Sequence, residues 1–470
     1  MIGVVYCGEA NYNLWPISRD LHPVPFIRLA DHESFIQKLY KLCEKLSDVD
    51  SLLIITEKRF YFRARREFAA LNIRKKAFFH VVSENGGPLL AAAIACLQVR
   101  EKFGGNMPIL FLDADQHIVY DEEFAGAIGE ARKMAEQNRL VLLGLEPEDG
   151  KHFFGYCEIN GKTGAVARID ESMDVPPRHE SALSGKWIGN TGIYCFGAED
   201  MTSRLSVAAP ETLAAAAKLL PHSLLSNTGD TVYFSSADGG IELAGTTLER
   251  VIAEASPATF AVEARFDWVR LTSLGEMGSL YPLDDAGNHV LNPEWTVIQD
   301  ARNCDITTHE RVVGVLGVDN LVIVDTTDAL LVADKSRLDS VHSLCAAIPP
   351  KNQVVRRQHR IIHCPWGSYT LLETGERYII KRLTIKPGES ISLQLHYHRS
   401  EHWVVVTGMA TVVHDEETRY IPTDESIYIK AGIKHRVTNE GMIDLNIIEV
   451  QTGDYLNEND IKRFSDLYGR

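Results

Sequence analysis

The stretch that decides the fold of the C-terminal part of the chain is PGESISLQLHYHRSEHWVVVTG, residues 387–408. Its central run is typical of a β-strand, on which every second residue shares a face. Gln394, His396 and His398 are therefore expected to point the same way, and Glu401 follows them within a short turn. Side chains that bind metal ions are thus predicted to gather on and just after one strand.

The rest of the C-terminal part indicates the same β-rich structure. From about residue 362 nearly every segment is a short β-run, among them YIIKRLTI, HWVVVTGMATVVH and LNIIEVQTG. Many short strands with turns between them favour a small β-barrel or jelly roll. The run KAGIKHRVTN, residues 430–439, places His435 on a later strand of this domain.

The spacing of the opening stretch resembles the first cupin motif. Gly388 is followed after five residues by Gln394-x-His396, then after four residues by Glu401, and after six more by Gly408. Many cupins have histidine where this chain has the glutamine, and the Gln-x-His variant is similar to that of phosphomannose isomerases.

The second cupin motif is recognisable in Gly432, His435 and Asn439. Two imidazoles, a carboxylate and an amide carbonyl suit zinc or another divalent first-row metal ion. The metal ligands that the resemblance implies are Gln394, His396, Glu401 and His435.

Nearly all of residues 360–470 resembles the type II phosphomannose isomerases, whose domains occur fused behind a mannose-1-phosphate guanylyltransferase. The segments that carry this likeness include PWGSYTLLETGERYIIKRLTI, IIEVQTGDYL and the ending RFSDLYGR. Lys430 departs from the usual proline, which affects a turn and not a ligand. The resemblance implies a metal-dependent isomerase that interconverts mannose 6-phosphate and fructose 6-phosphate.

Such a reaction moves a proton between C1 and C2 of the sugar, so it requires a base near the metal. His398 and Glu449 are both candidates for that base, and the sequence does not choose between them. The phosphate needs cationic partners, of which Arg399 and Arg463 are favoured because both lie inside the family-like motifs. The other basic residues near the motifs are Lys434, Arg436 and Arg470.

The first part of the chain alternates short apolar runs with helical patterns, which predicts a mostly parallel, Rossmann-like α/β sheet covered by helices. From about residue 286 to 332, short β-runs follow each other closely, which suggests a small β-solenoid or hairpin array, and residues 333–348 read as one helix. We therefore expect three domains, with boundaries at 1–285, 286–350 and 351–470.

Residues 1–335 resemble the guanylyltransferase part of these fusions, but the residues that would bind the nucleotide are changed. The glycine-rich phosphate loop reads GEANYN at residues 8–13, and the position of a family lysine falls at Val24. Glu84 stands where the family has an arginine, and Arg270 stands where it has its second metal-binding aspartate, which leaves Asp115 as a single carboxylate. Because phosphoryl-type transfer depends on positioning and charge neutralisation, we expect this activity to be lost.

Composition bounds the remaining possibilities. The chain has 470 residues, a net charge of −16 and eight cysteines spread singly. The charge argues against a nucleic-acid or acidic-membrane partner, and no run approaches the length of a membrane-spanning helix. With no signal-peptide pattern at the N-terminus, we expect a cytoplasmic protein, and the solenoid-like stretch or the helix after it would serve as the surface of a homodimer.

Two other functions are compatible with the sequence. The chain could be a bifunctional enzyme that still transfers the guanylyl group through altered contacts, which retention of a weak GTP site would favour. It could instead be a non-catalytic sugar-nucleotide-binding regulator, although an intact set of cupin ligands speaks against this.

Overall fold

The chain forms two compact units in the computed structural model, Met1–Arg356 and Arg357–Arg470, and each is described by itself. The structure describes residues 1–8, 10–83, 86–148, 151–161, 163–171, 186–220, 223–225, 231–234, 247–254, 259–309 and 311–465. Glu84 and Arg470, which the sequence analysis singled out, lie outside these residues. The expected division of the first unit at residue 285 stays a prediction.

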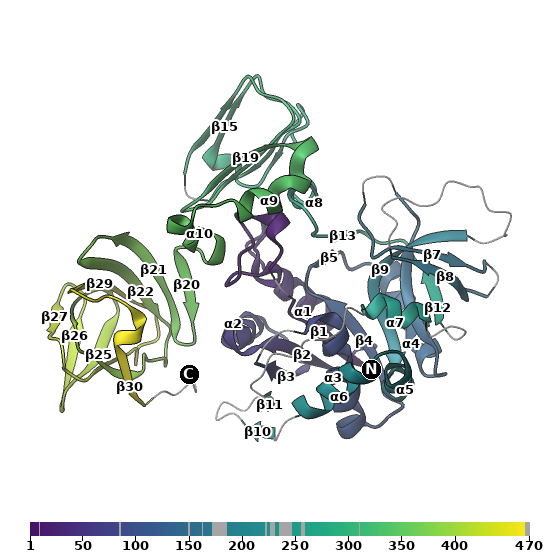
Figure 1. Cartoon of the computed structure of the whole chain (residues 1–470), viewed down its shortest axis with the longest axis horizontal. Helices are drawn as coiled ribbons and strands as arrows, with labels where there is room; N and C mark the ends of the chain where they lie inside the picture. Colours follow the sequence, from purple (N-terminus) through teal and green to yellow (C-terminus); the bar gives the residue numbers. More distant parts are fainter. Residues whose placement is uncertain are drawn as a thin grey trace. The chain divides into compact units, whose positions relative to one another are not determined.

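An eleven-stranded sheet organises the first unit (Figure 1). The strand order is β10-β11-β3-β2-β1-β4-β9-β6-β12, and β7 and β8 extend it beside β9. The bounds are β1 Ile2–Tyr6, β2 Ser51–Glu57, β3 Lys76–Val82, β4 Pro108–Asp113, β6 Leu140–Leu145, β7 Tyr156–Ile159, β8 Val166–Asp170, β9 Lys186–Gly197, β10 Ser223–Leu225, β11 Thr231–Phe234 and β12 Thr259–Glu263.

The centre of this sheet is parallel and buried on both faces. β1 pairs in parallel with β2 and β4, and β2 with β3, whereas β9 runs antiparallel to β4 and β6. Strands buried on both sides are apolar without alternation, which explains why the runs IGVVY and SLLIITE are buried at every position.

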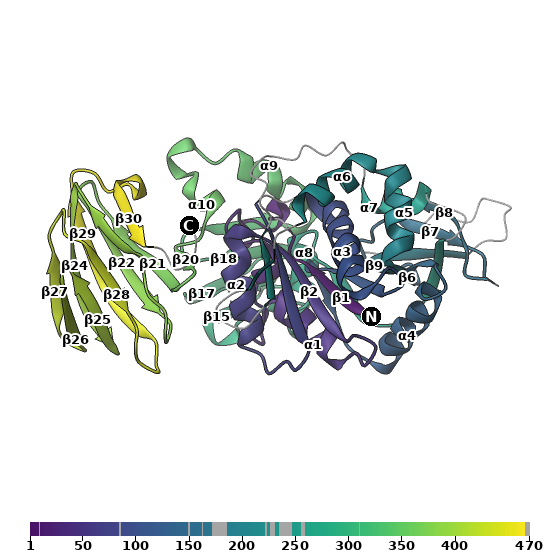
Figure 2. The same cartoon turned by 90° about the horizontal axis from the view of Figure 1, so that it is seen from below.

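Helices cover both faces of the sheet, as the expected α/β fold requires (Figure 2). One face packs against α1, α2 and α4, and the other against α3, α5, α6 and α7. Their bounds are α1 Phe35–Lys45, α2 Lys58–Ala69, α3 Gly87–Phe103, α4 Glu122–Ala135, α5 Ala198–Ala208, α6 Pro210–Leu219 and α7 Leu248–Glu254. The three-layer α/β architecture therefore agrees with the sequence.

Beyond the sheet, a short strand pair leads into a region of stacked short strands. β5 (Gln116–Ile118) pairs antiparallel with β13 (Trp268–Arg270). In the stack, β14 pairs in parallel with β16, β16 with β18, and β15 with β17, while β19 runs antiparallel to β18. Parallel pairing of every second strand favours a solenoid over a hairpin array, in which neighbouring strands pair antiparallel. The bounds are β14 His289–Val290, β15 Thr296–Gln299, β16 Asp305–Thr307, β17 Val313–Leu316, β18 Leu321–Asp325 and β19 Leu330–Asp334.

The helical segment expected at 333–348 is divided in the structure. A 3-10 helix covers Lys335–Ser340 and the α-helix α9 covers Val341–Ala346, and two further short helices are α8, Leu274–Ser279, and α10, Val354–Arg357. No helix among the residues that the structure describes is long and apolar enough to cross a membrane.

A buried ion pair ties the loop after β1 to the loop between β18 and β19. The Arg19 guanidinium, which is fully buried, donates to both carboxylate oxygens of Asp328 at 2.8 and 2.7 Å, and also to Thr326 Oγ1. We expect Arg19→Ala to lower the free energy of unfolding of this unit by about 3–5 kcal/mol, because it leaves a buried carboxylate without its partner. Chemical denaturation followed by circular dichroism measures the change.

The matched control is Arg168→Ala, which removes a pair with Asp170 whose arginine is largely exposed. Its expected cost is below about 1 kcal/mol. Equal costs for the two variants would contradict a special role for the buried pair.

The second unit is a β-sandwich of a six-stranded and a five-stranded sheet. The orders are β20-β21-β22-β29-β24-β27 and β26-β25-β28-β23-β30, and the buried apolar side chains of both sheets form one core. The bounds are β20 Ile361–Cys364, β21 Gly367–Thr374, β22 Tyr378–Ile385, β23 Leu393–His396, β24 Arg399–Thr407, β25 Met409–His414, β26 Glu417–Pro422, β27 Ser426–Ile429, β28 His435–Thr438, β29 Leu445–Gly453 and β30 Ile461–Ser465. This is the expected all-β cupin architecture.

Two glycines of the cupin motifs have a structural reason to be glycine. Gly408 joins β24 to β25 with a φ of 87°, and Gly432 precedes β28 with a φ of 85°. Side chains rarely adopt this left-handed region. A Cβ on Gly408 would also lie 3.3 Å from Leu445 Cα, so the turn between β24 and β25 requires glycine.

Candidate metal centre and active site

Three of the predicted metal ligands meet inside the second unit. His396 ends β23, Glu401 lies on β24 and His435 begins β28. Each side chain is almost completely buried, and one ligand atom from each lies within 4.8 Å of the other two. The two sheets thus bring together residues that are up to 39 positions apart in the chain.

The hydrogen bond of His435 Nδ1 leaves the other ring nitrogen, Nε2, free to bind a metal ion. The Nδ1 atom lies 2.9 Å from the Ile433 carbonyl oxygen, which only accepts, so Nδ1 carries the proton. The lone pair on Nε2 then faces Glu401 Oε2 at 3.6 Å. Both of these atoms are buried and have no hydrogen-bond partner among the described residues.

On the other side of Glu401, the His396 ring is held by several groups. Its Nε2 atom lies 3.1 Å from Glu401 Oε1 and 3.3 Å from the Arg399 guanidinium. The Arg399 Nε atom donates to the same Glu401 oxygen at 3.2 Å. Arg399 therefore orients two of the ligands.

Gln394, the predicted fourth ligand, lies beside the other three. Its amide nitrogen is 3.5 Å from His396 Nε2, and its amide oxygen accepts from Ser392. A half-turn of the terminal amide exchanges these two atoms and presents the oxygen. The structure brings Gln394 to the site, and its role as a ligand stays a prediction.

The charges at the site suit a cation. Burial opposes ionisation of Glu401, but its close contacts with His396, His435 and Arg399 hold the pKa of Glu401 well below its usual value. Burial lowers the pKa of His435. A carboxylate and a neutral imidazole are the forms that bind a metal ion. The buried, unpartnered donor atoms and their chemistry therefore fit a divalent first-row ion.

A cavity of about 100 Å³ opens next to these ligands. Basic and acidic side chains from both sheets line it, which fits a charged and polar ligand. Its charged and amide lining residues include Lys381, Gln394, Arg399, Glu401, Glu449 and Arg463.

Glu449, one of the two predicted bases, lines this cavity from β29. Trp403 Nε1 donates to its Oε1 at 3.1 Å, and Gln451 Nε2 donates to its Oε2 at 3.0 Å. Gln451 Nε2 also lies 3.2 Å from Glu401 Oε1, so one amide bridges the two carboxylates. Burial and the neighbouring charge of Glu401 raise the pKa of Glu449 to about 8.

His398, the other predicted base, lies away from the ligands. β23 ends at His396, and His398 follows in a bend, so the shared face expected for it was wrong. Its Nδ1 atom pairs with Asp460 at 2.8 Å, and the ring is mostly exposed. Since His398 does not line the cavity that the structure describes, the geometry favours Glu449 as the base.

The predicted phosphate-binding residues separate into two groups. Arg399 and Arg463 line the cavity, and their role in binding the phosphate stays a prediction. Lys434 and Arg436 flank His435 and do not line it; the Lys434 ammonium lies over the Phe464 ring. For Arg436, strand alternation explains this, because its neighbour His435 on β28 points to the opposite face.

Sequence reasoning missed Lys381 and Gln451. Lys381 lies on β22, and its pairing partner on β29 is Glu449. Gln451 is two residues beyond Glu449 on the same strand, so strand alternation would have placed both on one face. No motif spacing points to Lys381, because only the pairing of β22 with β29 brings it to the cavity.

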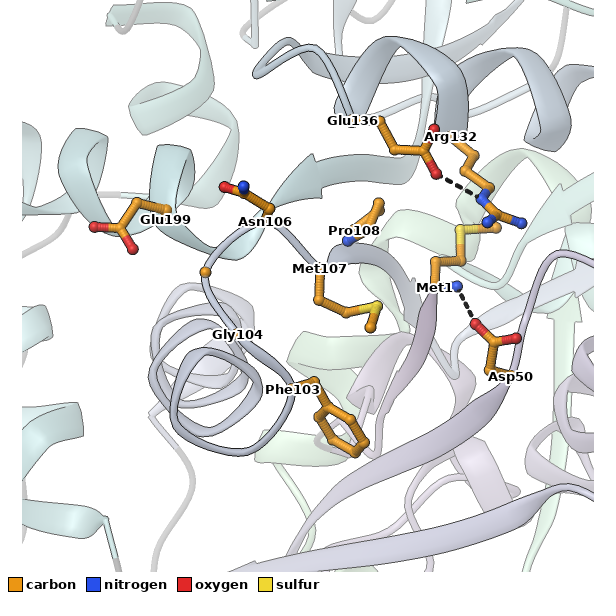
Figure 3. Close-up of a pocket in the computed structure, with 11 residues that line it drawn as sticks. Met1, Asp50, Phe103, Gly104, Asn106, Met107, Pro108, Arg132, Glu136 and Glu199 are labelled. Atoms are coloured by element: carbon orange, nitrogen blue, oxygen red, sulfur yellow. Dashed lines mark hydrogen bonds and ion pairs between the residues drawn. The ribbon is translucent and has the colours of Figure 1, made fainter.

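A larger groove in the first unit lies at the opposite end of the sheet from the expected nucleotide site. Its volume is about 630 Å³, and Figure 3 shows Pro108 and Arg132 on its wall. Pro108 begins β4, so the groove is at the amino end of that strand. Ligands of open α/β sheets bind at the carboxyl ends, so this groove is not the candidate nucleotide site.

Comparison with known proteins bears on both units. A family model described as mannose-6-phosphate isomerase C-terminal matches residues 351–466, and one described as MannoseP isomerase/GMP-like beta-helix domain matches residues 295–346. The chain is 30% identical to the alginate biosynthesis protein AlgA of Pseudomonas syringae pv. tomato, over all of this chain and 97% of that protein. It is 31% identical to a mannose-1-phosphate guanylyltransferase of Salmonella montevideo, over 99% of each.

Among solved structures, the fold is similar to that of a protein from Thermus thermophilus described as mannose-1-phosphate geranyltransferase. The TM-score is 0.58 at 20% identity, and the match covers 73% of this chain and 98% of that one. This likeness bears on the fold alone, and it confirms the nucleotidyltransferase-like α/β fold expected for the first unit.

Proposed function

The chain belongs to the family of mannose-1-phosphate guanylyltransferases that end in a mannose-6-phosphate isomerase domain, and we propose that it is a metal-dependent mannose-6-phosphate isomerase. The observation that carries the proposal is the buried group of His396, Glu401 and His435 beside a charged cavity. The product would be fructose 6-phosphate.

The roles of the residues follow from their positions. A divalent ion held by Gln394, His396, Glu401 and His435, most simply zinc, would polarise the sugar oxygens and stabilise the negative charge that develops on them. Glu449 moves the proton between C1 and C2 of the sugar, because it is a buried, cavity-lining carboxylate outside the ligand set, whereas Glu458, which also lines the cavity, pairs with Lys381. Arg463 and Lys381 supply positive charge for the phosphate.

A coupled assay tests this function. Purified chain loaded with Zn²⁺, Mn²⁺ or Co²⁺ is expected to interconvert mannose 6-phosphate and fructose 6-phosphate, and a chelator is expected to abolish the reaction reversibly. Absence of turnover with every metal would support a non-catalytic binding protein instead.

Metal binding is also expected to stabilise the protein. A ligand present at 100 times its dissociation constant adds about 2.7 kcal/mol to the folded state, so the melting temperature of the second unit should rise when Zn²⁺ is added after chelation. The triple variant His396→Ala, Glu401→Gln, His435→Ala is the control, and it is expected to show no rise. An equal rise in both proteins would mean that the metal binds elsewhere.

We further propose that the first unit has lost guanylyltransferase activity. Arg270 beside Asp115 supports this, because a guanidinium stands where the family has a metal-binding aspartate. The relative from Salmonella montevideo is named a mannose-1-phosphate guanylyltransferase, which favours the alternative, a bifunctional enzyme. Incubation with GTP, mannose 1-phosphate and Mg²⁺ decides between them, since robust release of pyrophosphate would establish the bifunctional alternative.

A further inference from the structure

A basic side chain and several carboxylates meet at the carboxyl end of β4. Asp113 ends this strand and Asp115 follows it. Arg270 ends β13, whose antiparallel register with β5 places Arg270 opposite Gln116, next to Asp115. The Arg270 Nε atom donates to Asp115 Oδ2 at 3.2 Å. The contact is thus built into the pairing of two strands.

The guanidinium is held from a second side. Its central carbon lies 3.5 Å from the centre of the Phe154 ring, which is the geometry of a cation–π contact. Arg270 is therefore confined between an aromatic face and a carboxylate, and about three quarters of its side chain is buried. An arginine whose side chain simply extended into solvent would make neither contact.

One carboxylate oxygen of each aspartate near Arg270 lacks a hydrogen-bond partner among the described residues. Asp113 is nine-tenths buried, and its Oδ1 atom lies 3.3 Å from where a Cβ on Gly8 would stand, so it points toward the loop after β1. The Oδ1 atoms of Asp113 and Asp115 are both buried without a hydrogen-bond partner among the described residues.

Glu249 is a third acidic group near Arg270. Burial raises the pKa values of Glu249 and Asp113, and the charge of Arg270 opposes the rise in each. The positive charge of Arg270 thus favours the ionised form of both groups.

A divalent ion, which the family resemblance implies here, does not fit the residues present. The ion would need the Asp115 carboxylate that Arg270 already engages, and it would stand beside a fixed positive charge. The ion and the guanidinium are both positively charged, and two like charges that contact the same carboxylate repel strongly in a partly buried site. With the guanidinium removed, the buried and unpartnered oxygens of Asp113 and Asp115 have the chemistry that Mg²⁺ and Mn²⁺ prefer.

We propose that Arg270 is an internal counter-cation that takes the place of a divalent metal ion at the carboxyl end of β4, and that Asp113 and Asp115 form a latent metal site which becomes available when Arg270 is removed. This deepens the proposed loss of guanylyltransferase activity and is independent of the isomerase. A metal count, and not an activity, tests it.

The experiment compares Mn²⁺ binding to the full-length chain by isothermal titration calorimetry and by electron paramagnetic resonance. Relative to the unmodified chain, Arg270→Ala and Arg270→Asp are each expected to bind one additional Mn²⁺ ion, and Arg270→Asp is expected to bind it more tightly. Mn²⁺ is also expected to raise the melting temperature of Arg270→Asp. Because only the difference between variants counts, ions held by the second unit cancel.

Two controls make the test specific. Adding Asp115→Asn to Arg270→Asp is expected to remove the additional ion. Arg168→Asp, which creates a pair of acids with Asp170 on β8, is expected to add none.

Two results would overturn the proposal. One is an ion in the unmodified chain that Asp115→Asn removes. The other is an unchanged metal count in variants of Arg270 whose circular dichroism shows them to be folded; Arg270→Ala serves here if Arg270→Asp fails to fold.

Discussion

Glu401→Gln is expected to lower kcat/KM of the isomerase reaction by more than about 100-fold and to remove most of the bound metal. Changes to groups that only support metal ligands already cost about 10–100-fold, and Glu401 is itself placed to be a ligand. The substitution keeps the shape of the side chain but removes the one negative charge among the three ligands. Metal content measured by mass spectrometry and the coupled assay report the two effects.

Glu425→Gln is the matched control, because Glu425 is an exposed carboxylate in the turn before β27. Its metal content and kcat/KM are expected to equal those of the unmodified protein. If the Glu401→Gln protein keeps its metal content and its kcat/KM, Glu401 is not a metal ligand. The proposed function would then lose its basis.

Glu449→Gln is expected to lower kcat by about 10²–10⁴-fold, the usual contribution of a general base, with little change in metal content. The neighbours of Glu449 explain why the protein should still fold: Trp403 and Gln451 donate to its oxygens, and an amide accepts one of these bonds in the same place. A fall in kcat with metal retained separates a proton-transfer group from a ligand. Loss of metal together with rate would mean that Glu449 belongs to the ligand set.

The pH dependence of stability gives a second readout in the metal-free protein. Because the pKa of Glu449 is raised to about 8 in the folded chain, the folded state binds more protons than the unfolded state between the ordinary glutamate pKa and that value. Stability then falls as pH rises through this window. Glu449→Gln removes this loss, so the variant should be no less stable than the parent at pH values near the raised pKa. Lower stability there would assign Glu449 a structural role.

His398→Ala tests the alternative base. Since His398 is outside the cavity and paired with Asp460, its removal is expected to change kcat by less than about tenfold, well short of the range of a general base. A loss as large as that of Glu449→Gln would contradict the assignment.

The sequence predicted the residues that meet at the candidate metal centre, because they lie in two short motifs with fixed spacing. It failed at His398, where strand alternation was extended two residues beyond the end of β23. It also missed Lys381, which reaches the cavity only through the pairing of β22 with β29. Spacing within one strand is local information, whereas pairing between distant strands depends on the whole sandwich.

In the first unit, continuous apolar runs were enough to predict a buried parallel sheet with helices on both faces. The substitution of Arg270 was also visible in the sequence, as the loss of a metal ligand. Its contact with Asp115 was not, because it depends on the register of β13 against β5. The sequence therefore indicated that a metal-binding aspartate is missing, and the structure showed that the Arg270 guanidinium contacts the remaining Asp115.

The amide of Gln451, which donates to both Glu401 and Glu449, has a thermodynamic consequence. Burial and the negative charge of Glu401 together hold the proton on Glu449, and a cation bound to Glu401 would offset that charge, so uptake of the metal would favour release of the proton. By reciprocity, release of the proton strengthens the hold on the metal. The apparent metal affinity should therefore increase with pH up to about 8 and then level off, so that the centre is filled and its base set free in a single linked equilibrium.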